Sequence, residues 1–240
     1  MTSNSLTITA DNGGTFDAYI ARPNGNGPFP AIIVIQEIFG VNADLRTKCD
    51  DFAKQGYIAV SPDLFWRQEP GVQLTDQTDE EWAKAKSLLQ GFHVDFGVED
   101  LKATLMAVRT LHDCNGKVGT VGYCLGGRLA YLMATRSNAD GNIGYYGVTL
   151  ESYLNESNNI QAPLMLHIAD QDSFSTPEAR AEVKRGLELN PHVTIHSYDA
   201  DHAFARENGQ HYDAASATLA NQRTADFFAQ TLKGEKRQAA

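Results

Sequence analysis

The sequence is poor in cysteine and has no long apolar run. Its three cysteines, Cys49, Cys114 and Cys124, are an odd number and form no C-x-x-C pair, which argues against a disulfide framework and indicates a reducing compartment. No apolar stretch approaches the roughly 20 residues that a membrane-spanning helix needs. The first residues also lack the basic start and apolar stretch of a signal peptide. We therefore expect a cytoplasmic protein without a membrane partner.

Positive charge is also scarce. The chain has 20 Lys and Arg residues against 30 Asp and Glu, so its formal net charge is -10. Such a surface repels phosphate backbones, and we expect no nucleic-acid partner. An anionic small molecule is still compatible with it, because one or two local arginines can dominate inside a low-dielectric cleft. The expected partner is a small-molecule substrate.

The length of 240 residues fits one large α/β domain over residues 1–240. Short β-rich runs alternate with helical patterns. We expect strands over 6–9, 16–21, 31–35, 57–60, 117–121, 143–146, 164–168 and 193–198, and helices over 44–55, 79–90, 98–112, 128–136, 177–189 and 214–232. The first two strands should form an antiparallel hairpin across the turn at 11–14. The alternation predicts an α/β fold whose mostly parallel central sheet has helices on both faces. Ligands then bind beyond the carboxyl ends of the strands.

The strongest local signal is the segment Gly122-Tyr123-Cys124-Leu125-Gly126-Gly127, between a predicted strand and a predicted helix. It matches the G-x-S-x-G nucleophile elbow with cysteine in the nucleophile position. The sharp turn needs neighbours without side chains, and the following helix N-terminus stabilises negative charge on a thiolate. Alternatively, Cys124 is a small core residue and the glycines only make a tight turn. A bare G-x-C-x-G occurs often by chance, so the partner residues decide.

An elbow hydrolase places an acid and a histidine after later strands, in that order. Here strand 164–168 leads to Asp170 and Asp172, and strand 193–198 leads to His202. His202 can take the thiol proton while a carboxylate fixes its tautomer. Taken singly, His202 could be a solvated loop histidine and Asp172 a helix or turn cap. The required order after three strands favours a Cys–His–Asp triad.

Several neighbouring groups leave choices open. Asp170 competes with Asp172 as the acid, and Asp199 or Asp201 could contact His202 locally. His167 lies inside an apolar strand and is interpreted as a hydrogen-bonded core histidine. The other histidines show no ligand spacing with Cys or carboxylates, so we expect no metal site.

The loop Gln36-Glu37-Ile38-Phe39-Gly40 follows the buried strand 31–35. In an elbow hydrolase this loop gives one backbone N–H to the oxyanion hole, and the residue after the nucleophile gives the other. Those residues are Ile38 and Leu125. Glu37 is expected near the site, since a carboxylate directly after five apolar residues is unusual. Its alternative role is an N-terminal cap for the next helix.

Taken together, these segments resemble the dienelactone hydrolase (carboxymethylenebutenolidase) family of α/β-hydrolases. The resemblance covers roughly residues 15–230 and rests on Gln36–Gly40, Gly122–Gly127, Gly144–Gly147, Asp172 and Asp201–Arg206. It implies a monomeric, cofactor-free enzyme that opens an unsaturated lactone during chloroaromatic breakdown. The segment after Asp172 resembles the family's acid turn, so Asp172 is preferred to Asp170.

The resemblance also implies roles for single residues. Cys124, Asp172 and His202 would form the triad. Glu37 would contact the resting thiol and change partners when substrate binds. Arg206 would bind the substrate carboxylate and pair with Glu37 in one of the two states.

One position departs from the family pattern. Where a second substrate-binding arginine is expected, on helix 79–90, this chain has Trp82. Lys86 on the same helix could replace the lost charge, but an ammonium does not reproduce the planar fork of a guanidinium. Both residues are taken as candidate substrate contacts. The departure favours a different anion, or a more neutral lactone or ester.

The predicted reaction is hydrolysis of a small lactone through a thioester on Cys124. An enolate leaving group suits a thiol nucleophile, so unactivated esters and amides should be poor substrates. A broad-specificity carboxylesterase is the alternative enzyme. A non-catalytic ligand-binding or redox-sensing protein, with Cys124 only oxidised, is the alternative outside enzymes.

Overall fold

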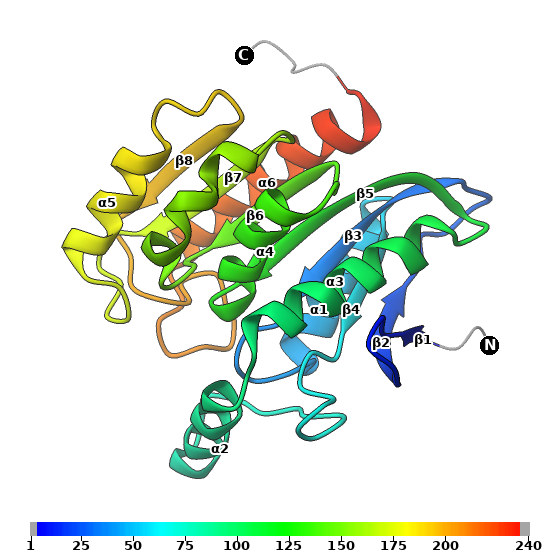
Figure 1. Ribbon diagram of the computed structural model, residues 1–240, viewed down its shortest axis with the longest axis horizontal. Coiled ribbons are helices and arrows are strands. Elements are labelled where there is room, and N and C mark those ends of the chain that lie inside the picture. Colours follow the sequence, from blue (N-terminus) through cyan, green and yellow to red (C-terminus); the bar gives the residue numbers. More distant parts are fainter. Residues whose placement is uncertain (1–3, 236–240) are drawn as a thin grey trace. The chain divides into compact units, whose positions relative to one another are not determined.

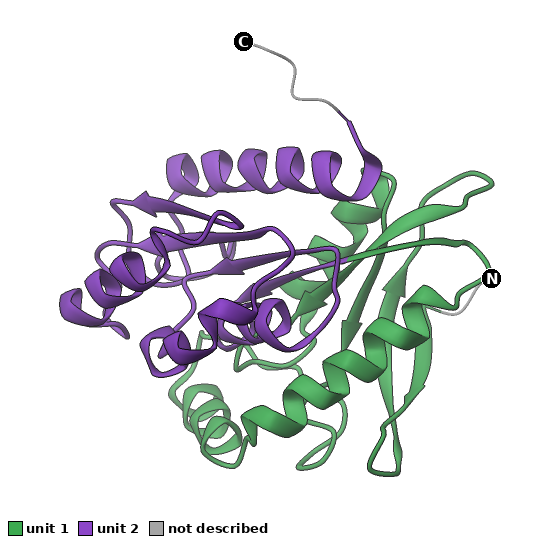
Figure 2. Cartoon of the chain, turned by 45° about the horizontal axis from the view of Figure 1, so that its top comes forward, with its two compact units in different colours: residues 1–118 green, residues 119–240 purple. Residues whose placement is uncertain are grey.

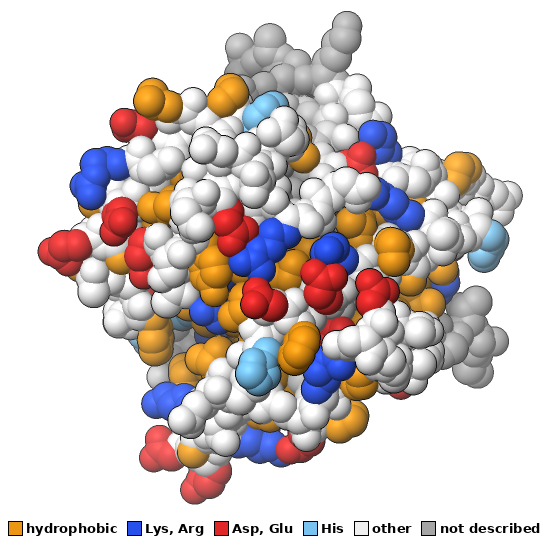
Figure 3. Space-filling model, viewed as in Figure 1, with side chains coloured by type: hydrophobic (Ala, Val, Ile, Leu, Met, Phe, Trp, Pro, Cys, Tyr) orange, Lys and Arg blue, Asp and Glu red, His pale blue; other side chains and the backbone are white. Residues whose placement is uncertain are grey.

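The computed structural model describes residues 4–235 (Figure 1). The chain divides into two compact units, residues 1–118 and 119–240 (Figure 2). The interpretation of residues 1–240 as a single domain stays a prediction. On the face shown in Figure 3, acidic and basic side chains are interspersed.

The first unit contains four strands in the order β1-β2-β4-β3. Their bounds are β1 Ser5–Thr9, β2 Thr15–Ala21, β3 Phe29–Ile35 and β4 Ile58–Pro62. β1 and β2 form the predicted antiparallel hairpin, β2 runs antiparallel to β4, and β3 runs parallel to β4. Every residue of β3 after Phe29 is buried, as its continuous apolar run predicts.

Three helices accompany these strands: α1 Ala43–Lys54, α2 Asp79–Gln90 and α3 Val94–Arg109. Asn42 caps α1 by accepting a hydrogen bond from the Leu45 N–H at 3.1 Å. The helix stops at the predicted glycine, since Gly56 has a φ of 88°. α3 begins four residues before the expected start at 98. Its first turn carries Gly97, which contributes no apolar periodicity.

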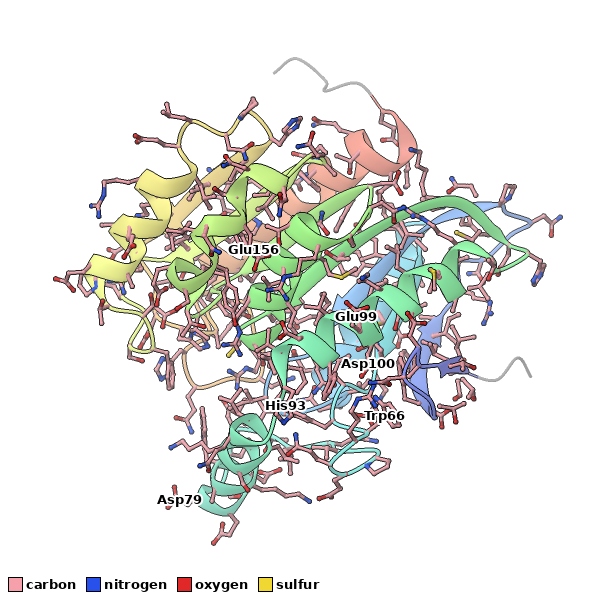
Figure 4. The ribbon with its side chains drawn as sticks, viewed as in Figure 1. Trp66, Asp79, His93, Glu99, Asp100 and Glu156 are labelled. Carbon is pink, nitrogen blue, oxygen red and sulfur yellow. The ribbon has the colours of Figure 1, made fainter. Side chains whose placement is uncertain are left out.

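A buried carboxylate joins α3 to the segment that follows β4. Asp100 of α3 is 2% exposed. It accepts hydrogen bonds from Trp66 Nε1 at 2.8 Å and from an Arg67 guanidinium nitrogen at 2.6 Å. Trp66 and Asp100 are both labelled in Figure 4. The pairing fixes the long connection between β4 and α2 at its beginning.

The second unit, which begins within β5 at residue 119, takes its strands in the order β5-β6-β7-β8, and all three pairs are parallel. The strands are β5 Cys114–Tyr123, β6 Gly141–Tyr145, β7 Leu164–Ala169 and β8 Val193–Tyr198; the helices are α4 Leu125–Arg136, α5 Pro177–Leu187 and α6 Ala214–Lys233. A 3-10 segment, η1 Leu150–Asn159, was not predicted. Figure 2 shows the long helix α6 along one face of these strands and α4 on the other. The α/β prediction with mostly parallel strands is confirmed.

α4 starts at Leu125, three residues before the expected start at 128. Glycines disfavour helix, so the pattern placed Gly126 and Gly127 outside it. In the structure both glycines belong to the helix. A side chain at position 127 would collide with the Tyr145 carbonyl, so this helical position requires glycine. Close backbone packing therefore overrides helix propensity here. Within residues 4–235, no helix combines the length and apolar character that crossing a membrane requires.

Candidate active site

Cys124 lies on the turn between β5 and α4 in a strained backbone conformation. Its φ is 55° and its ψ is -112°, a region that residues with a Cβ rarely occupy. The Cys124 N–H donates to the Tyr145 carbonyl at 3.1 Å, and the Cys124 carbonyl accepts from the Arg128 N–H at 3.2 Å. The turn is thereby fixed to β6 on one side and to α4 on the other.

The positions around Cys124 require glycine, because backbone atoms of neighbouring segments occupy the space that a side chain would need. A Cβ on Gly122 would overlap the carbonyl of Gly126, and a Cβ on Gly144 would lie 2.8 Å from the Gly127 carbonyl oxygen. β5, α4 and β6 therefore approach each other through bare backbone. This packing holds the sulfur-bearing residue at the tip of the turn, half-buried.

The structure brings the three predicted triad residues together in the second unit. His202 Nδ1 lies 2.8 Å from Asp172 Oδ2, and the His202 ring is also hydrogen-bonded to the Cys124 side chain. His202 and Asp172 are 5% and 6% exposed. The second Asp172 oxygen accepts from the Phe174 N–H at 2.8 Å. This is the order nucleophile, base and orienting acid that acyl transfer requires.

Two of the competing carboxylates have other partners. Asp170 pairs with Lys184 Nζ at 2.9 Å. Asp199 accepts from Gln171 Nε2 at 2.9 Å. Of the acids after β7, it is therefore Asp172 that orients the His202 ring.

Asp201 does contact His202, through the backbone. One Asp201 oxygen accepts from the His202 N–H at 2.6 Å and from the Ser173 N–H at 3.1 Å. The other lies 2.7 Å from His211 Nδ1. Burial would raise the pKa of Asp201, but these two N–H groups and His211 lower it below its ordinary value. Asp201 thus ties the loop after β7 to the loop after β8.

The charge of His202 depends on its two partners. Burial alone would lower the pKa of this imidazole, because it disfavours the charged ring. The negative charge on Cys124 and the hydrogen bonds to Asp172 and Cys124 outweigh burial and raise the pKa of His202 to about 10. At neutral pH the buried His202 ring is therefore protonated.

Two aromatic rings enclose His202, and the sequence pattern did not reveal them. Tyr146 meets the imidazole edge-on with 5.1 Å between ring centroids, and Phe174 does so at 4.8 Å. Tyr146 directly follows β6, and Phe174 lies in the loop after β7. Their places just beyond strand ends were the available signal.

The predicted oxyanion-hole residues lie in different units. Leu125 is the first residue of α4, so its N–H belongs to the first turn, where a helix offers no acceptor. Ile38 follows β3 in the first unit and is 6% exposed. Gln36 holds that loop by accepting from the Leu64 N–H at 3.0 Å. Their joint role at an oxyanion stays a prediction.

Glu37 and Arg206 are both buried, at 7% exposure each. Glu37 belongs to the first unit and Arg206 to the second, in the loop that carries His202. The alternative role of Glu37 as a helix cap is wrong, because Asn42 caps α1. The exchange of partners implied for this pair stays a prediction.

Trp82 packs against the loop after β3. Its ring meets the Phe39 ring edge-on at 5.1 Å, and its Nε1–H donates to the Asp76 carbonyl at 3.1 Å. Lys86 is exposed, with its ammonium 5.5 Å from the centroid of the Trp82 ring. Trp82 thus lies beside the segment that holds Glu37 and Ile38, and contact of Trp82 or Lys86 with substrate stays a prediction.

Comparisons with known proteins agree over nearly the whole chain. The model of the Dienelactone hydrolase family matches residues 16–232. A protein of Azospirillum brasilense, provisionally named carboxymethylenebutenolidase, is 48% identical over 229 residues, covering 95% of this chain and 98% of that protein. The carboxymethylenebutenolidase of Pseudomonas putida is 41% identical over 230 residues, covering 95% and 97%.

A solved structure gives the same fold. The crystal structure of a provisionally named dienelactone hydrolase from Klebsiella pneumoniae matches with a TM-score of 0.82 and 28% identity, covering 94% of this chain and 97% of that one. The α/β-hydrolase fold predicted from the sequence is confirmed.

Proposed function

Because the chain belongs to the dienelactone hydrolase family, we propose that it hydrolyses a small lactone of the dienelactone type with Cys124 as nucleophile. The observation that carries the proposal is the contact of Cys124 and Asp172 with His202 at a strained elbow. The names of the Azospirillum and Pseudomonas relatives support the lactone as substrate.

The reaction begins with attack of the Cys124 thiolate on the lactone carbonyl carbon. The Leu125 N–H, in the first turn of α4, stabilises the resulting oxyanion. The ring C–O bond then breaks, the electron pair leaves on the enolate oxygen, and a thioester to Cys124 remains. His202 supplies the proton that the enolate takes up, and Asp172 keeps the imidazole oriented.

Water completes the cycle. His202, now neutral, takes a proton from the water that attacks the thioester carbonyl. The C–S bond breaks, the acid product leaves, and the thiolate facing a protonated His202 is restored. Because an enolate is a good leaving group, a thiol nucleophile is enough for acylation. Alkoxide leaving groups are poor, so alkyl esters should react slowly.

The alternative enzyme is a carboxylesterase with broad specificity. The observation that favours it is Trp82, an aromatic side chain where the family resemblance implies an arginine. An aromatic contact suits a neutral acyl or aryl group. A substrate panel with and without a free carboxylate separates the two functions.

The decisive experiment follows the decay of dienelactone ultraviolet absorbance with purified protein. The wild type should clear the substrate, and Cys124→Ala should reduce the rate by at least about a thousandfold. Mass spectrometry should find the acyl group on the Cys124 peptide after a rapid acid quench. No decay with a reduced wild-type thiol would refute the lactone substrate and direct the search to neutral esters. Binding without turnover of either would favour the non-catalytic alternative.

A further inference from the structure

Arg128 stands one helical turn after Cys124 on α4. Its backbone N–H donates to the Cys124 carbonyl at 3.2 Å, so the two residues share one edge of the helix. Side chains on a helix lean toward its N-terminus. The Arg128 side chain therefore leans toward the turn that carries the nucleophile.

The guanidinium of Arg128 is held by Thr149. One terminal nitrogen donates to Thr149 Oγ1 at 2.8 Å. The Thr149 hydroxyl donates its own proton to the Val148 carbonyl at 2.7 Å, so towards Arg128 it only accepts. Thr149 adopts a left-handed conformation, with a φ of 60°. The segment before it packs tightly on α4, since a Cβ on Gly147 would lie 3.0 Å from the backbone nitrogen of Arg128.

A second donor of the guanidinium has no acceptor. Among the described residues 4–235, none accepts a hydrogen bond from the buried Nε of Arg128. Burial lowers the pKa of Arg128, whereas the charges of Tyr153 and Cys124 oppose that shift. A partly desolvated cation with a free donor close to the nucleophile is a site for an anion.

Other arginines of the second unit are engaged with protein groups. Arg136 forms a bidentate pair with Glu156, at 2.6 and 2.8 Å. Arg180 donates to backbone carbonyls, including that of Asp170 at 2.6 Å. Arg223 donates to the Tyr198 hydroxyl at 3.0 Å. Arg128 differs from these three in having a buried guanidinium nitrogen without a hydrogen-bond partner.

We propose that Arg128 binds the carboxylate of an anionic substrate whose carbonyl is held at Cys124, and so sets the preference of this enzyme for acids over neutral esters. The chain carries tryptophan where the resemblance implies a second arginine, and Arg128 supplies a planar guanidinium from the nucleophile's own helix. For the substrate, this inference rests on the proposed acyl transfer. Anion binding beside Cys124 does not, and can be tested alone.

The first test uses two alkylating agents of similar size, iodoacetate and iodoacetamide. In both, the thiolate attacks the methylene carbon and iodide leaves, but only iodoacetate carries a carboxylate. Arg128→Gln should lower the iodoacetate rate at Cys124 about tenfold while leaving the iodoacetamide rate unchanged. Labelling is followed on the Cys124 peptide by mass spectrometry. Arg185→Gln, an equal loss of charge at an exposed site on α5, is the matched control and should change neither rate.

The second test uses turnover. With dienelactone, Arg128→Gln should raise KM on the order of 10- to 100-fold and change kcat little. With an uncharged aryl ester, KM should stay at the wild-type value. Arg128→Lys, which keeps the charge and loses the fork, should give an intermediate KM for the anion.

The outcomes separate this inference from the proposed function. If iodoacetate selectivity falls in Arg128→Gln but no lactone is turned over, the anion site stands and the lactone proposal fails. If lactone is hydrolysed but Arg128→Gln changes neither alkylation rate and neither KM value, the lactone proposal stands and the role of Arg128 is refuted. Equal losses for charged and neutral reagents would also refute it, because they indicate a structural role.

Discussion

At the scale of single residues, the proposed chemistry depends on the charge of His202, which its partners Cys124 and Asp172 control. Burial disfavours a charged imidazole, yet the pKa of His202 is raised to about 10. The thiolate and Asp172 together outweigh desolvation, and the contact with Asp172 is 2.8 Å long. A raised histidine pKa means that the ring stays protonated as pH rises. In the proposed reaction His202 therefore serves first as an acid, and it becomes a base only after it has protonated the leaving group.

We therefore predict that His202 loses its high pKa when the thiolate is removed. In Cys124→Ala, the charge and the hydrogen bond from sulfur are both absent, so burial dominates and the pKa of His202 should fall well below about 10. The measurement is a pH titration of the His202 ring signal by NMR, assigned with His202→Gln. Cys114→Ser is the control thiol and should leave the titration unchanged. An unaltered midpoint in Cys124→Ala would mean that Asp172 alone sustains the imidazolium.

At the scale of elements, two kinds of contact hold the second unit together. Close backbone packing joins β5, α4 and β6, and a series of hydrogen-bonded polar side chains joins α6 to β6, β7 and β8. Arg223 of α6 donates to the Tyr198 hydroxyl, which is hydrogen-bonded to His167 Nδ1 at 2.7 Å. His167 Nε2 is hydrogen-bonded to Thr224 Oγ1 at 3.2 Å, and Thr224 in turn meets the Tyr145 hydroxyl at 2.6 Å. Each buried group has a partner, which a low-dielectric interior demands. The interpretation of His167 as a hydrogen-bonded core histidine is confirmed.

The close backbone packing at the Cys124 turn leads to a testable prediction. Gly122→Ala places a Cβ on the Gly126 carbonyl, and because the obstacle is backbone, the turn itself must open. We expect a loss of about 1–3 kcal/mol in unfolding free energy and at least about a tenfold fall in kcat. Gly116→Ala, in the same strand, meets nothing within 4 Å but has a φ of 87°. It should cost about 1–2 kcal/mol and leave kcat unchanged. If kcat falls alike in both variants, the effect is general destabilisation.

At the scale of the whole molecule, the sequence predicts the order of helices and strands more accurately than the residues at which they begin and end. Apolar periodicity and turn residues predicted α2 at 79–90 correctly and placed His202 and Asp172 after the right strands. The starts of α3 and α4 were missed because Gly97, Gly126 and Gly127 carry no apolar signal, and helix propensity counts against them.

Some features of the site had only a weak signal in the sequence pattern, or none. The rings of Tyr146 and Phe174 around His202 depend on which strand ends become neighbours. The 3-10 segment η1 has no regular period to reveal it. The proposed anion-binding character of Arg128 arises from its burial and from its hydrogen-bond partner, and neither can be predicted from the sequence alone.

The buried His167 makes the stability of the folded chain depend on pH. It is 1% exposed, and burial lowers its pKa well below 6.5, with His196 and Arg223 acting in the same direction. The native protein thus keeps His167 neutral, while the unfolded chain binds a proton there below about pH 6.5. A lowered histidine pKa contributes stability that is present above that pH and is lost as pH falls.

We predict that the unfolding free energy drops by up to about 1.4 kcal/mol per pH unit below pH 6.5 through this residue alone. His167→Gln, which retains polar groups but does not titrate, should be less stable at pH 7.5 and show a shallower decline towards pH 5. His192→Gln, at an exposed turn, should follow the wild type throughout. Urea unfolding across this range measures all three. Parallel slopes in wild type and His167→Gln would mean that the native interior accepts the proton, and that the polar chain from Arg223 to Tyr145 can carry a positive charge.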